Sequence, residues 1–264
     1  MYFIGIGGIG VSALARYFLA RGFEVSGSDA AESEIVEELR NLDVEIFIGH
    51  RAENLDSRLR GNDSRVIYSA AVKEENLELV EARRLNIKTQ KYAEALEKLT
   101  REKFTIAISG THGKSTVTAM VGLMMERAGL DPTVIVGTKV REWDNSNFRA
   151  GQSKYLVIEA DEYDRSFLNY WPKIIILTNI EEDHLDTYPG GLPDIMETFS
   201  EYISHLPEDG TLIANEEDIN ISKIKDQKSK LQFKIQNYNS NVVEGLNLKI
   251  PGRHNLSNAN AALA

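Results

Sequence analysis

The sequence contains no cysteine among its 264 residues. Disulfides, thiolate metal sites and thiol catalysis are therefore excluded, and the composition fits a cytoplasmic protein. Long apolar stretches are also missing: no run reaches the roughly 18 residues of a membrane-spanning helix, so we expect no insertion into a membrane. Basic residues are scarce relative to acidic ones, with 30 against 40 and a net charge of −10. Because they form no basic stripe, nucleic acid is not expected as a partner.

The chain has enough apolar residues to bury more than one core. Hydrophobic residues make up 42% of it, and its length leaves room for one large or two ordinary domains. A helix predicted over residues 92–99 ends in a polar stretch, and a new apolar strand begins at Phe104. This change of pattern predicts an α/β protein with one domain over residues 1–99 and a second over residues 100–264.

A glycine loop opens the chain. An apolar strand leads into Gly5-x-Gly7-x-x-Gly10, a helix with one apolar face follows, and a second strand ends at Asp29. This β-α-β unit, with an acidic residue about 20 positions beyond the loop, is the fingerprint of dinucleotide binding. Taken alone it predicts NAD, with the pyrophosphate at the helix N-terminus and the ribose at Asp29. The alternative is that the glycines serve only close packing of helix and strand.

The rest of the first domain alternates between helix and strand. Helical and strand patterns follow one another over residues 33–41, 44–48, 65–69 and 76–86, which predicts a small Rossmann-like parallel sheet. Residues 55–65 are polar and rich in turn formers where a short connection is expected, so we interpret them as a solvated surface insertion.

A second glycine loop, GTHGKS, occupies residues 110–115. It is shorter than the P-loop of nucleotide-binding proteins, because Ile108 stands where that pattern has its first glycine. The context is nevertheless that of a P-loop: an apolar strand over residues 104–108 precedes it, and a helical pattern over residues 115–127 follows.

Phosphate binding follows from this strand, turn and helix. Unpaired backbone N–H groups and the helix dipole favour an anion over residues 113–116. Lys114 would reach the outer phosphates, and the Ser115 hydroxyl would bind a bridging Mg²⁺. A purely structural glycine turn is the alternative, and the Lys-Ser-Thr sequence at the helix start favours phosphate over it.

Acidic residues gather directly after two later strands, over residues 155–158 and 174–177. The carboxyl ends of parallel strands meet at one edge of a sheet, so both clusters should converge with the P-loop. Hard oxygen ligands and an imidazole beside a triphosphate suit Mg²⁺, whereas acidic helix N-caps would explain either cluster alone. The clusters are Glu159, Asp161, Glu162 and Asp164 after the first strand, and Asn179, Glu181, Glu182, Asp183, His184 and Asp186 after the second.

Five motifs in this order resemble the Mur ligases of peptidoglycan synthesis, over essentially the whole chain. They are the opening glycine loop with its acidic partner, SGTHGKST, EADEYDRSF, TNIEEDHLD and PGRHNLSNANAALA. The resemblance is strongest to the members that add L-alanine to UDP-N-acetylmuramate. It implies that ATP phosphorylates the muramyl carboxylate and that the amine of alanine attacks the acyl phosphate. The first loop would then hold the pyrophosphate of UDP rather than that of NAD.

The resemblance also implies which residues act. Lys114, Glu159 and His184 would be catalytic, and Ser115, Glu159 and His184 would ligate Mg²⁺. The segment GRHNLSN would contact adenine, whereas on the residues alone it is a polar loop in which Asn255 caps the last helix. The expected contacts to the UDP-sugar are Gly7, Gly8, Ile9, Gly10 and Asp29. Those to ATP are Gly110, Thr111, His112, Gly113, Lys114, Ser115, Thr116, His254, Asn255 and Asn258.

The chain departs from the family pattern at its end. The chain stops at Ala264, where the family continues into a third α/β domain that closes over ATP, so we expect a central domain that is incomplete and a turnover that is weak or absent. Two other functions stay open at this point. One is the related ligase that attaches a recycled tripeptide to UDP-N-acetylmuramate, and the other is a nucleotide-binding module without catalysis.

Overall fold

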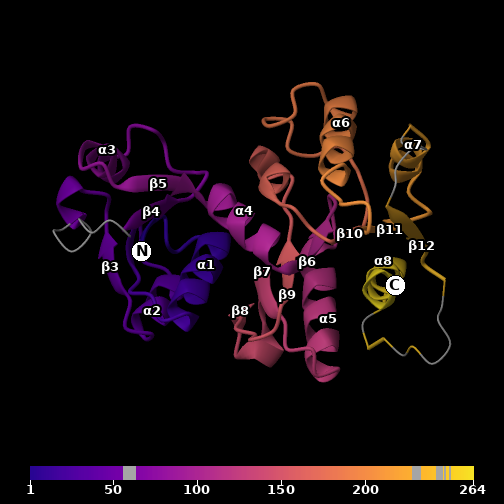
Figure 1. Ribbon diagram of the computed structural model, residues 1–264, viewed down its shortest axis with the longest axis horizontal. Coiled ribbons are helices and arrows are strands. Elements are labelled where there is room, and N and C mark those ends of the chain that lie inside the picture. The colour runs from indigo at the N-terminus through magenta and orange to yellow at the C-terminus, as the bar shows by residue number, and fades with distance from the viewer. Residues whose placement is uncertain (56–63, 228–232, 242–245, 247, 250) are drawn as a thin grey trace. The chain divides into compact units, whose positions relative to one another are not determined.

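A computed structural model describes all residues except 56–63, 228–232, 242–245, 247 and 250 (Figure 1). The chain divides into two compact units. Unit 1 comprises Met1–Leu96 and Gly137–Ala150, and unit 2 comprises Glu97–Val136 and Gly151–Ala264. Among the helices described, none combines the length and the apolar character that crossing a membrane requires.

Unit 1 is built on a five-stranded sheet in the order β3-β2-β1-β4-β5, and each strand runs parallel to its neighbours. Two connecting helices begin at side-chain caps. The Ser33 hydroxyl accepts from the Val36 N–H at 3.2 Å, and the Asn76 side-chain oxygen Oδ1 accepts from the Glu78 N–H at 3.0 Å. The predicted Rossmann-like architecture is confirmed. Its elements are β1 (Tyr2–Ile4), α1 (Ile9–Ala20), β2 (Ser26–Asp29), α2 (Glu34–Arg40), β3 (Glu45–Ile48), η1 (Ala52–Asn54), β4 (Arg65–Tyr68), α3 (Leu77–Arg84), β5 (Lys88–Lys91) and α4 (Tyr92–Glu102).

Two details of unit 1 differ from the sequence prediction. Strand β5 was not expected, since its sequence KTQK is polar, and only its place at the sheet edge beside β4 makes it a strand. The interpretation of residues 55–65 as a surface insertion is wrong at both ends: Leu55 is buried in the core and Arg65 begins β4. Residues 56–63, which form the middle of that insertion, lie outside the described part of the chain.

Residues 137–150 pack within unit 1, although they follow the second glycine loop in the sequence. The Asn147 amide donates to the Ile9 carbonyl at 2.5 Å and to the Ser12 hydroxyl at 2.9 Å, so it contacts the first turn of α1. Lys139 forms ion pairs with Glu34 and Glu38 of α2. No pattern in the sequence predicts this return, which takes in the end of β7 and all of β8.

Unit 2 centres on β6, which lies between β9 and β10 in the sheet order β12-β11-β10-β6-β9-β7-β8. The three central strands are parallel, and the register pairs Ile108 with Glu159 and Ser109 with Leu177. Their carboxyl ends therefore finish at nearly the same level, as predicted. The elements of unit 2 are β6 (Phe104–Ser109), α5 (Lys114–Arg127), the first half of β7 (Thr133–Val140), β9 (Tyr155–Glu159), η4 (Tyr163–Asn169), β10 (Ile174–Leu177), α6 (Leu192–Ile203), β11 (Thr211–Asn215), α7 (Ile219–Gln227), β12 (Lys234–Tyr238) and α8 (Arg253–Leu263). The segment that returns to unit 1 adds η3 (Arg141–Trp143) and β8 (Ser146–Arg149).

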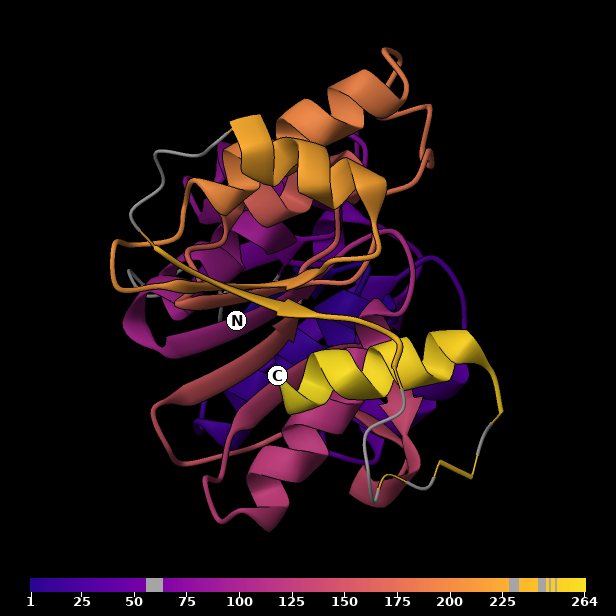
Figure 2. The ribbon, with the colours of Figure 1, turned by 90° about the vertical axis from the view of Figure 1, so that its right-hand side faces the viewer.

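Helix α8 brings the end of the chain back onto the second glycine loop. Figures 1 and 2 show it beside α5, against which it packs. The expectation that Asn255 caps this helix is wrong, because the helix begins at Arg253 with Gly252 as its N-cap. The Asn255 amide instead donates to the Pro251 carbonyl at 2.8 Å.

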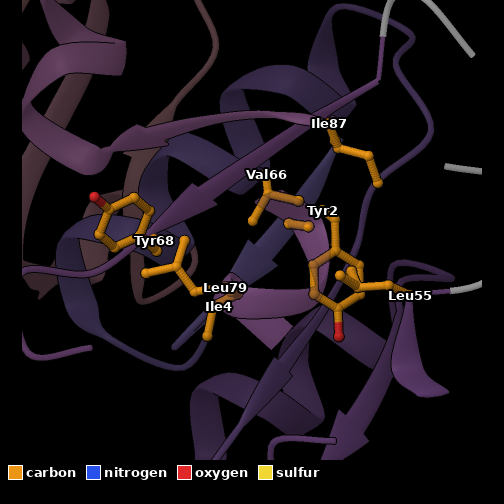
Figure 3. Close-up of a cluster of buried hydrophobic side chains, with 8 residues drawn as sticks. Tyr2, Ile4, Leu55, Val66, Tyr68, Leu79 and Ile87 are labelled. Carbon is orange, nitrogen blue, oxygen red and sulfur yellow. The ribbon is translucent and has the colours of Figure 1, made fainter. Parts of the chain in front are cut away.

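One core of unit 1 lies between its sheet and α3 (Figure 3). Residues from β1 and β4 meet the inner face of the helix, where Leu79 is fully buried. The opposite face of the same helix is exposed, and Leu77 there is 59% accessible to solvent. The buried members are Tyr2, Ile4, Leu55, Val66, Tyr68, Leu79, Ala82 and Ile87.

We predict that Leu79→Ala lowers the free energy of unfolding of unit 1 by about 2–5 kcal/mol, because it removes buried methyl groups and leaves a cavity. Leu77→Ala makes the same chemical change on the exposed face and should cost less than about 1 kcal/mol. Hydrogen exchange of β1 and β4 peptides in urea reads the stability of unit 1 separately. Equal losses in the two variants would contradict this description of the core.

Candidate functional site

The second glycine loop needs its glycines for different reasons. Gly110 has a φ of +127°, and a Cβ there would lie 2.2 Å from the Thr178 hydroxyl oxygen, so a side chain has no room. Gly113 is the N-cap of α5 in the left-handed conformation, with a φ of +87°. Helix α5 then starts at Lys114, one residue before the predicted helical pattern, and presents its N-terminal N–H groups at the carboxyl edge of the sheet.

The segment directly after β10 forms hydrogen bonds with this loop. The Asn179 side chain accepts from the His112 N–H at 2.8 Å and donates to the His112 carbonyl at 2.9 Å. The Thr178 hydroxyl donates to the same carbonyl at 2.7 Å, and the Glu181 N–H donates to the Thr111 hydroxyl at 2.9 Å. The shortened loop is thus held both by its own backbone and by the segment that follows a neighbouring strand.

Lys114 is the cation of the loop, and it lies against an acidic side chain. Its ammonium donates to both carboxylate oxygens of Glu162, at 3.0 and 2.9 Å, and to the Gly110 carbonyl at 2.8 Å. The two side chains are 12% and 3% exposed, so the ion pair is largely shielded from water. The sequence places Glu162 in an acidic cluster but gives no sign of this pairing.

Burial changes the pKa of the Glu162 carboxyl group. Burial raises the pKa of Glu162 above its usual range, and the attraction of the Lys114 ammonium opposes the rise without cancelling it. The backbone carbonyl of Glu162 also accepts a hydrogen bond from the Tyr188 hydroxyl at 2.5 Å. This residue is therefore held from two sides beside the second glycine loop.

Oxygen and imidazole ligands converge near the loop in two groups. The Ser115 hydroxyl donates to the Glu159 carboxylate at 3.0 Å, which brings two of the predicted magnesium ligands together. The third predicted ligand, His184, falls in a group with Asp161 and Glu162, whose ligand atoms lie within 4.8 Å of one another. His184 has a φ of +49°, a conformation that few residues other than glycine adopt. Hard oxygens and an imidazole are a donor set that suits Mg²⁺.

The predicted adenine-contacting segment reaches the loop through one residue. Asn258 is nearly buried, and its side-chain oxygen would lie 2.5 Å from a Cβ at Gly113. His254 and Asn255 lie on the first turn of α8 and are more exposed. Of the three residues, Asn258 is thus the one whose contact with the loop the structure resolves.

The first glycine loop lies between the end of β1 and the N-terminus of α1. The Gly7 N–H donates to the Asp29 carboxylate at 2.8 Å, so the side chain at the end of β2 is hydrogen-bonded to the loop. A side chain at Gly10 would meet the ring of Tyr92 at 3.0 Å, whereas one at Gly8 would have no atom closer than 3.3 Å. The N-terminus of α1 begins at Ile9, where its N–H groups face the loop.

A cleft of about 500 Å³ lies beside this first loop. The loops after β1, β2, β3 and β4 all contribute to it, which places it at the carboxyl edge of the sheet. Sequence reasoning identified Gly5 and Asp29 but missed His50 and Lys73. The rule that ligands gather at strand ends would have found His50, since it lies two residues after β3. The lining residues are Gly5, Asp29, Ala30, His50, Ser69, Ala71, Val72, Lys73, Glu75 and Asn76.

Comparison with known proteins supports this arrangement of two loops. The family description "Mur ligase family, catalytic domain" matches residues 1–104, and "Mur ligase middle domain" matches residues 108–242, which is more than half of the chain. The chain belongs to the Mur ligase family. The matched segments are two successive Mur ligase modules, each opened by one of the glycine loops.

Relatives of similar sequence come from several bacteria. A UDP-N-acetylmuramate–L-alanine ligase of Trichlorobacter lovleyi is 46% identical over 224 residues, which cover 85% of this chain and 48% of that protein. One from Clostridium tetani is 40% identical, covering 100% of this chain and 61% of that protein. The chain thus spans about half the length of the first relative and less than two thirds of the second.

Solved structures show the same fold. The UDP-N-acetylmuramate–alanine ligase of Thermotoga maritima has a TM-score of 0.83 at 29% identity, over 99% of this chain and 63% of that chain. A tripeptide ligase from Neisseria meningitides has a TM-score of 0.87 over 99% of this chain and 91% of that chain; at 24% identity the likeness concerns the fold alone.

We predict that ionisation of Glu162 weakens folding. Its pKa is raised in the folded state, so the folded protein holds this proton more tightly than the unfolded chain, and stability falls as pH rises from about 4.3, the usual pKa of glutamate. Glu162→Gln cannot ionise. The free energy of unfolding of the parent should therefore fall relative to that of the variant across this rise in pH, in urea titrations with chelator present. Glu182→Gln, which makes the same substitution at an exposed carboxylate, is the matched control. A relative gain by the parent would contradict the burial argument.

Proposed function

We propose that the protein is an ATP-dependent ligase that joins L-alanine to UDP-N-acetylmuramate through an acyl phosphate. The observation that carries this proposal is the meeting of Lys114 and Ser115, at a helix N-terminus, with carboxylates from β9 and from the segment after it. Relatives that are 46% and 40% identical and bear the name of this activity support the choice of substrates. We place the reaction in peptidoglycan synthesis on the same grounds.

Unit 1 would bind the sugar nucleotide. The N-terminus of α1 offers free N–H groups to a pyrophosphate, and the cleft beside it is wide enough for a nucleoside. Gly7, Gly8, Ile9 and Gly10 would follow the phosphates, and Asp29 would stand at the ribose end.

Unit 2 would bind ATP. Residues 110–116 would surround the phosphates, with the Lys114 ammonium near the transferring group. Because Lys114 already has Glu162 as its counter-charge, an incoming phosphate has to share or replace that ion pair. Asn258, beside Gly113, and the neighbouring His254 and Asn255 would lie towards the adenine.

The ligand groups described above fit Mg²⁺ in chemistry. Ser115 and Glu159 already share a hydrogen bond, as neighbouring ligands of one ion would allow, and His184 stands with Asp161 and Glu162. Bound Mg²⁺ would neutralise phosphate charge in this site. The chain's own contribution is to hold these donors at the ends of rigid strands, where they need little rearrangement.

The proposed reaction has two steps. A carboxylate oxygen of the muramyl group bonds to the γ-phosphorus of ATP while the bond to the ADP oxygen breaks. The nitrogen of alanine next attacks the carbonyl carbon, the bond to phosphate breaks, and the amine gives up a proton. Lys114 and the N–H groups of α5 stabilise negative charge on the transferring phosphoryl group.

The overall test uses the protein that contains this chain. Calorimetry should detect UDP-N-acetylmuramate and MgATP binding separately, and phosphate release should require alanine. Mass spectrometry should identify UDP-N-acetylmuramyl-alanine as the product. Binding of both nucleotides without alanine-dependent release would replace the proposal with a non-catalytic module.

We predict that Gly8→Asp abolishes measurable binding of UDP-N-acetylmuramate while the protein stays folded. A Cβ at position 8 would lie 3.3 Å from the Gly5 carbonyl oxygen, so a side chain fits after a shift of a few tenths of an ångström. The φ of −65° suits any residue, but a carboxylate there would repel the pyrophosphate. Gly8→Asn has nearly the same shape without the charge and should retain much more affinity. Unchanged affinity in Gly8→Asp, or tight NADH binding by the parent, would count against the sugar-nucleotide site.

We predict that Lys114→Ala weakens ATP binding by roughly 30- to 150-fold, since a charge-assisted contact in a shielded site is worth about 2–3 kcal/mol. Lys98→Ala, at a lysine whose side chain is 73% exposed, should bind ATP like the parent. Calorimetry with MgATP measures both. Equal affinity of Lys114→Ala and parent would mean that the loop is only structural.

A further inference from the structure

Beneath the cleft of unit 1 lies a buried carboxylate that the proposed reaction does not use. The side chain of Glu78, on α3, is completely shielded from solvent. Its Oε1 accepts from the Tyr2 hydroxyl at 2.8 Å and from the Asn54 amide at 2.6 Å. A buried carboxylate is costly unless donors surround it, so this cluster needs an explanation. Figure 3 shows Tyr2 within the apolar core beside Leu55.

The second oxygen of Glu78 connects this cluster to the cleft. Oε2 accepts from the Ser28 hydroxyl at 2.5 Å and lies 2.9 Å from Nδ1 of His50, and the Ser28 oxygen lies 3.0 Å from the same Nδ1. Tyr2, Asn54 and Ser28 all donate to the carboxyl group, as they would to an ionised carboxylate, which can only accept. Because Ser28 gives its only proton to Glu78, both oxygens that face Nδ1 are acceptors, and Nδ1 must carry the proton.

This proton fixes the tautomer of the imidazole. With Nδ1 protonated and directed at Glu78, the other ring nitrogen, Nε2, is an acceptor in the neutral ring. His50 lines the cleft, and its side chain is 24% exposed, so the ring is open to a ligand on that side. The charged groups that share the cleft are Asp29 at the end of β2 and Lys73 and Glu75 in the loop before α3.

The cleft itself is placed as nucleotide sites are in parallel sheets. The chain runs outward from β1 to β2 and β3 on one side and continues through β4 to β5 on the other. The order reverses between β1 and β4, and Gly5 and Ser69, which follow these two strands, both line the cleft. Ligands of such sheets bind at this switch point.

We propose that Glu78 is a positioning residue that fixes the tautomer of His50, so that Nε2 accepts a hydrogen bond from the nucleoside of the bound sugar nucleotide. The donor would be a neutral O–H or N–H group, on the ribose or on the base. This inference rests on the proposed function, because it assumes that the nucleoside occupies this cleft. It assigns His50 to binding and Glu78 to the support of His50.

Glu78→Gln provides the sharpest test. Tyr2 and Asn54 both donate to the Oε1 side, which keeps the carbonyl of the new amide there and turns its NH₂ group towards His50. An NH₂ group can only donate, so the His50 ring should switch to the Nε2–H form and present a donor to the cleft. Nitrogen-15 NMR of the ring, assigned with His50→Gln, reads the tautomer directly, and calorimetry with UDP reads binding.

We expect Nδ1–H in the parent, Nε2–H in Glu78→Gln, and a roughly tenfold loss of UDP affinity in Glu78→Gln and in His50→Gln. Tyr2→Phe removes one hydrogen bond to Glu78 without touching His50, so it should keep both the tautomer and the affinity within about twofold. The analogues 2′-deoxy-UDP and 3-methyl-UDP identify the donor, because each lacks one candidate donor group. The analogue that lacks the true donor should bind to the parent and to Glu78→Gln with equal affinity.

Three results would overturn the inference. An unchanged tautomer in Glu78→Gln would remove the positioning role, and so would equal losses of affinity in Glu78→Gln and Tyr2→Phe, which would indicate a structural role only. Intact UDP binding in His50→Gln would refute the contact itself. If the parent bound neither UDP nor UDP-N-acetylmuramate, the proposed function would fail together with this inference.

Discussion

The close approach of backbone at the glycine turns after β1 and β6 is the constraint on which both sites depend. At Gly110 the chain passes so near Thr178 that no side chain fits, and at Gly5 it turns with a positive φ. Each turn lets a buried parallel strand lead directly into a helix whose first N–H groups stay unpaired. Polar residues at the ends of neighbouring strands hold the loops themselves, since Asp29 accepts from the Gly7 N–H and Asn179 accepts from the His112 N–H.

In each unit a buried carboxylate pairs with a basic side chain near a glycine loop or its cleft. Glu162 holds the ammonium of Lys114, and Glu78 holds the imidazole of His50, at 2.9 Å in each case. Such pairs contribute little net stability, because the loss of hydration offsets the attraction. Under the proposed function, their effect is to fix the direction and the protonation of one ligand-binding group before the ligand arrives, which is what a preorganised site requires.

The sequence predicted those parts of the fold that rest on local patterns. Glycine spacing located both loops, apolar periodicity located α1 and α5, and the carboxyl-end rule brought Glu159 and His184 towards Lys114. The return of residues 137–150 to unit 1 and the edge strand β5 rest on tertiary contacts, such as those of Asn147 with the first turn of α1. The pairs Lys114–Glu162 and His50–Glu78 join residues far apart in the sequence, and no local pattern marks them.

The central claim is that the two loops bind two different nucleotides. Hydrogen exchange measured with UDP-N-acetylmuramate, and separately with a non-hydrolysable ATP analogue and Mg²⁺, tests it most directly. The account predicts that the sugar nucleotide slows exchange at residues 5–12 and 69–76, and that the ATP analogue slows exchange at residues 110–118. Protection of the same loop by both ligands, or of neither loop by either ligand, would contradict it.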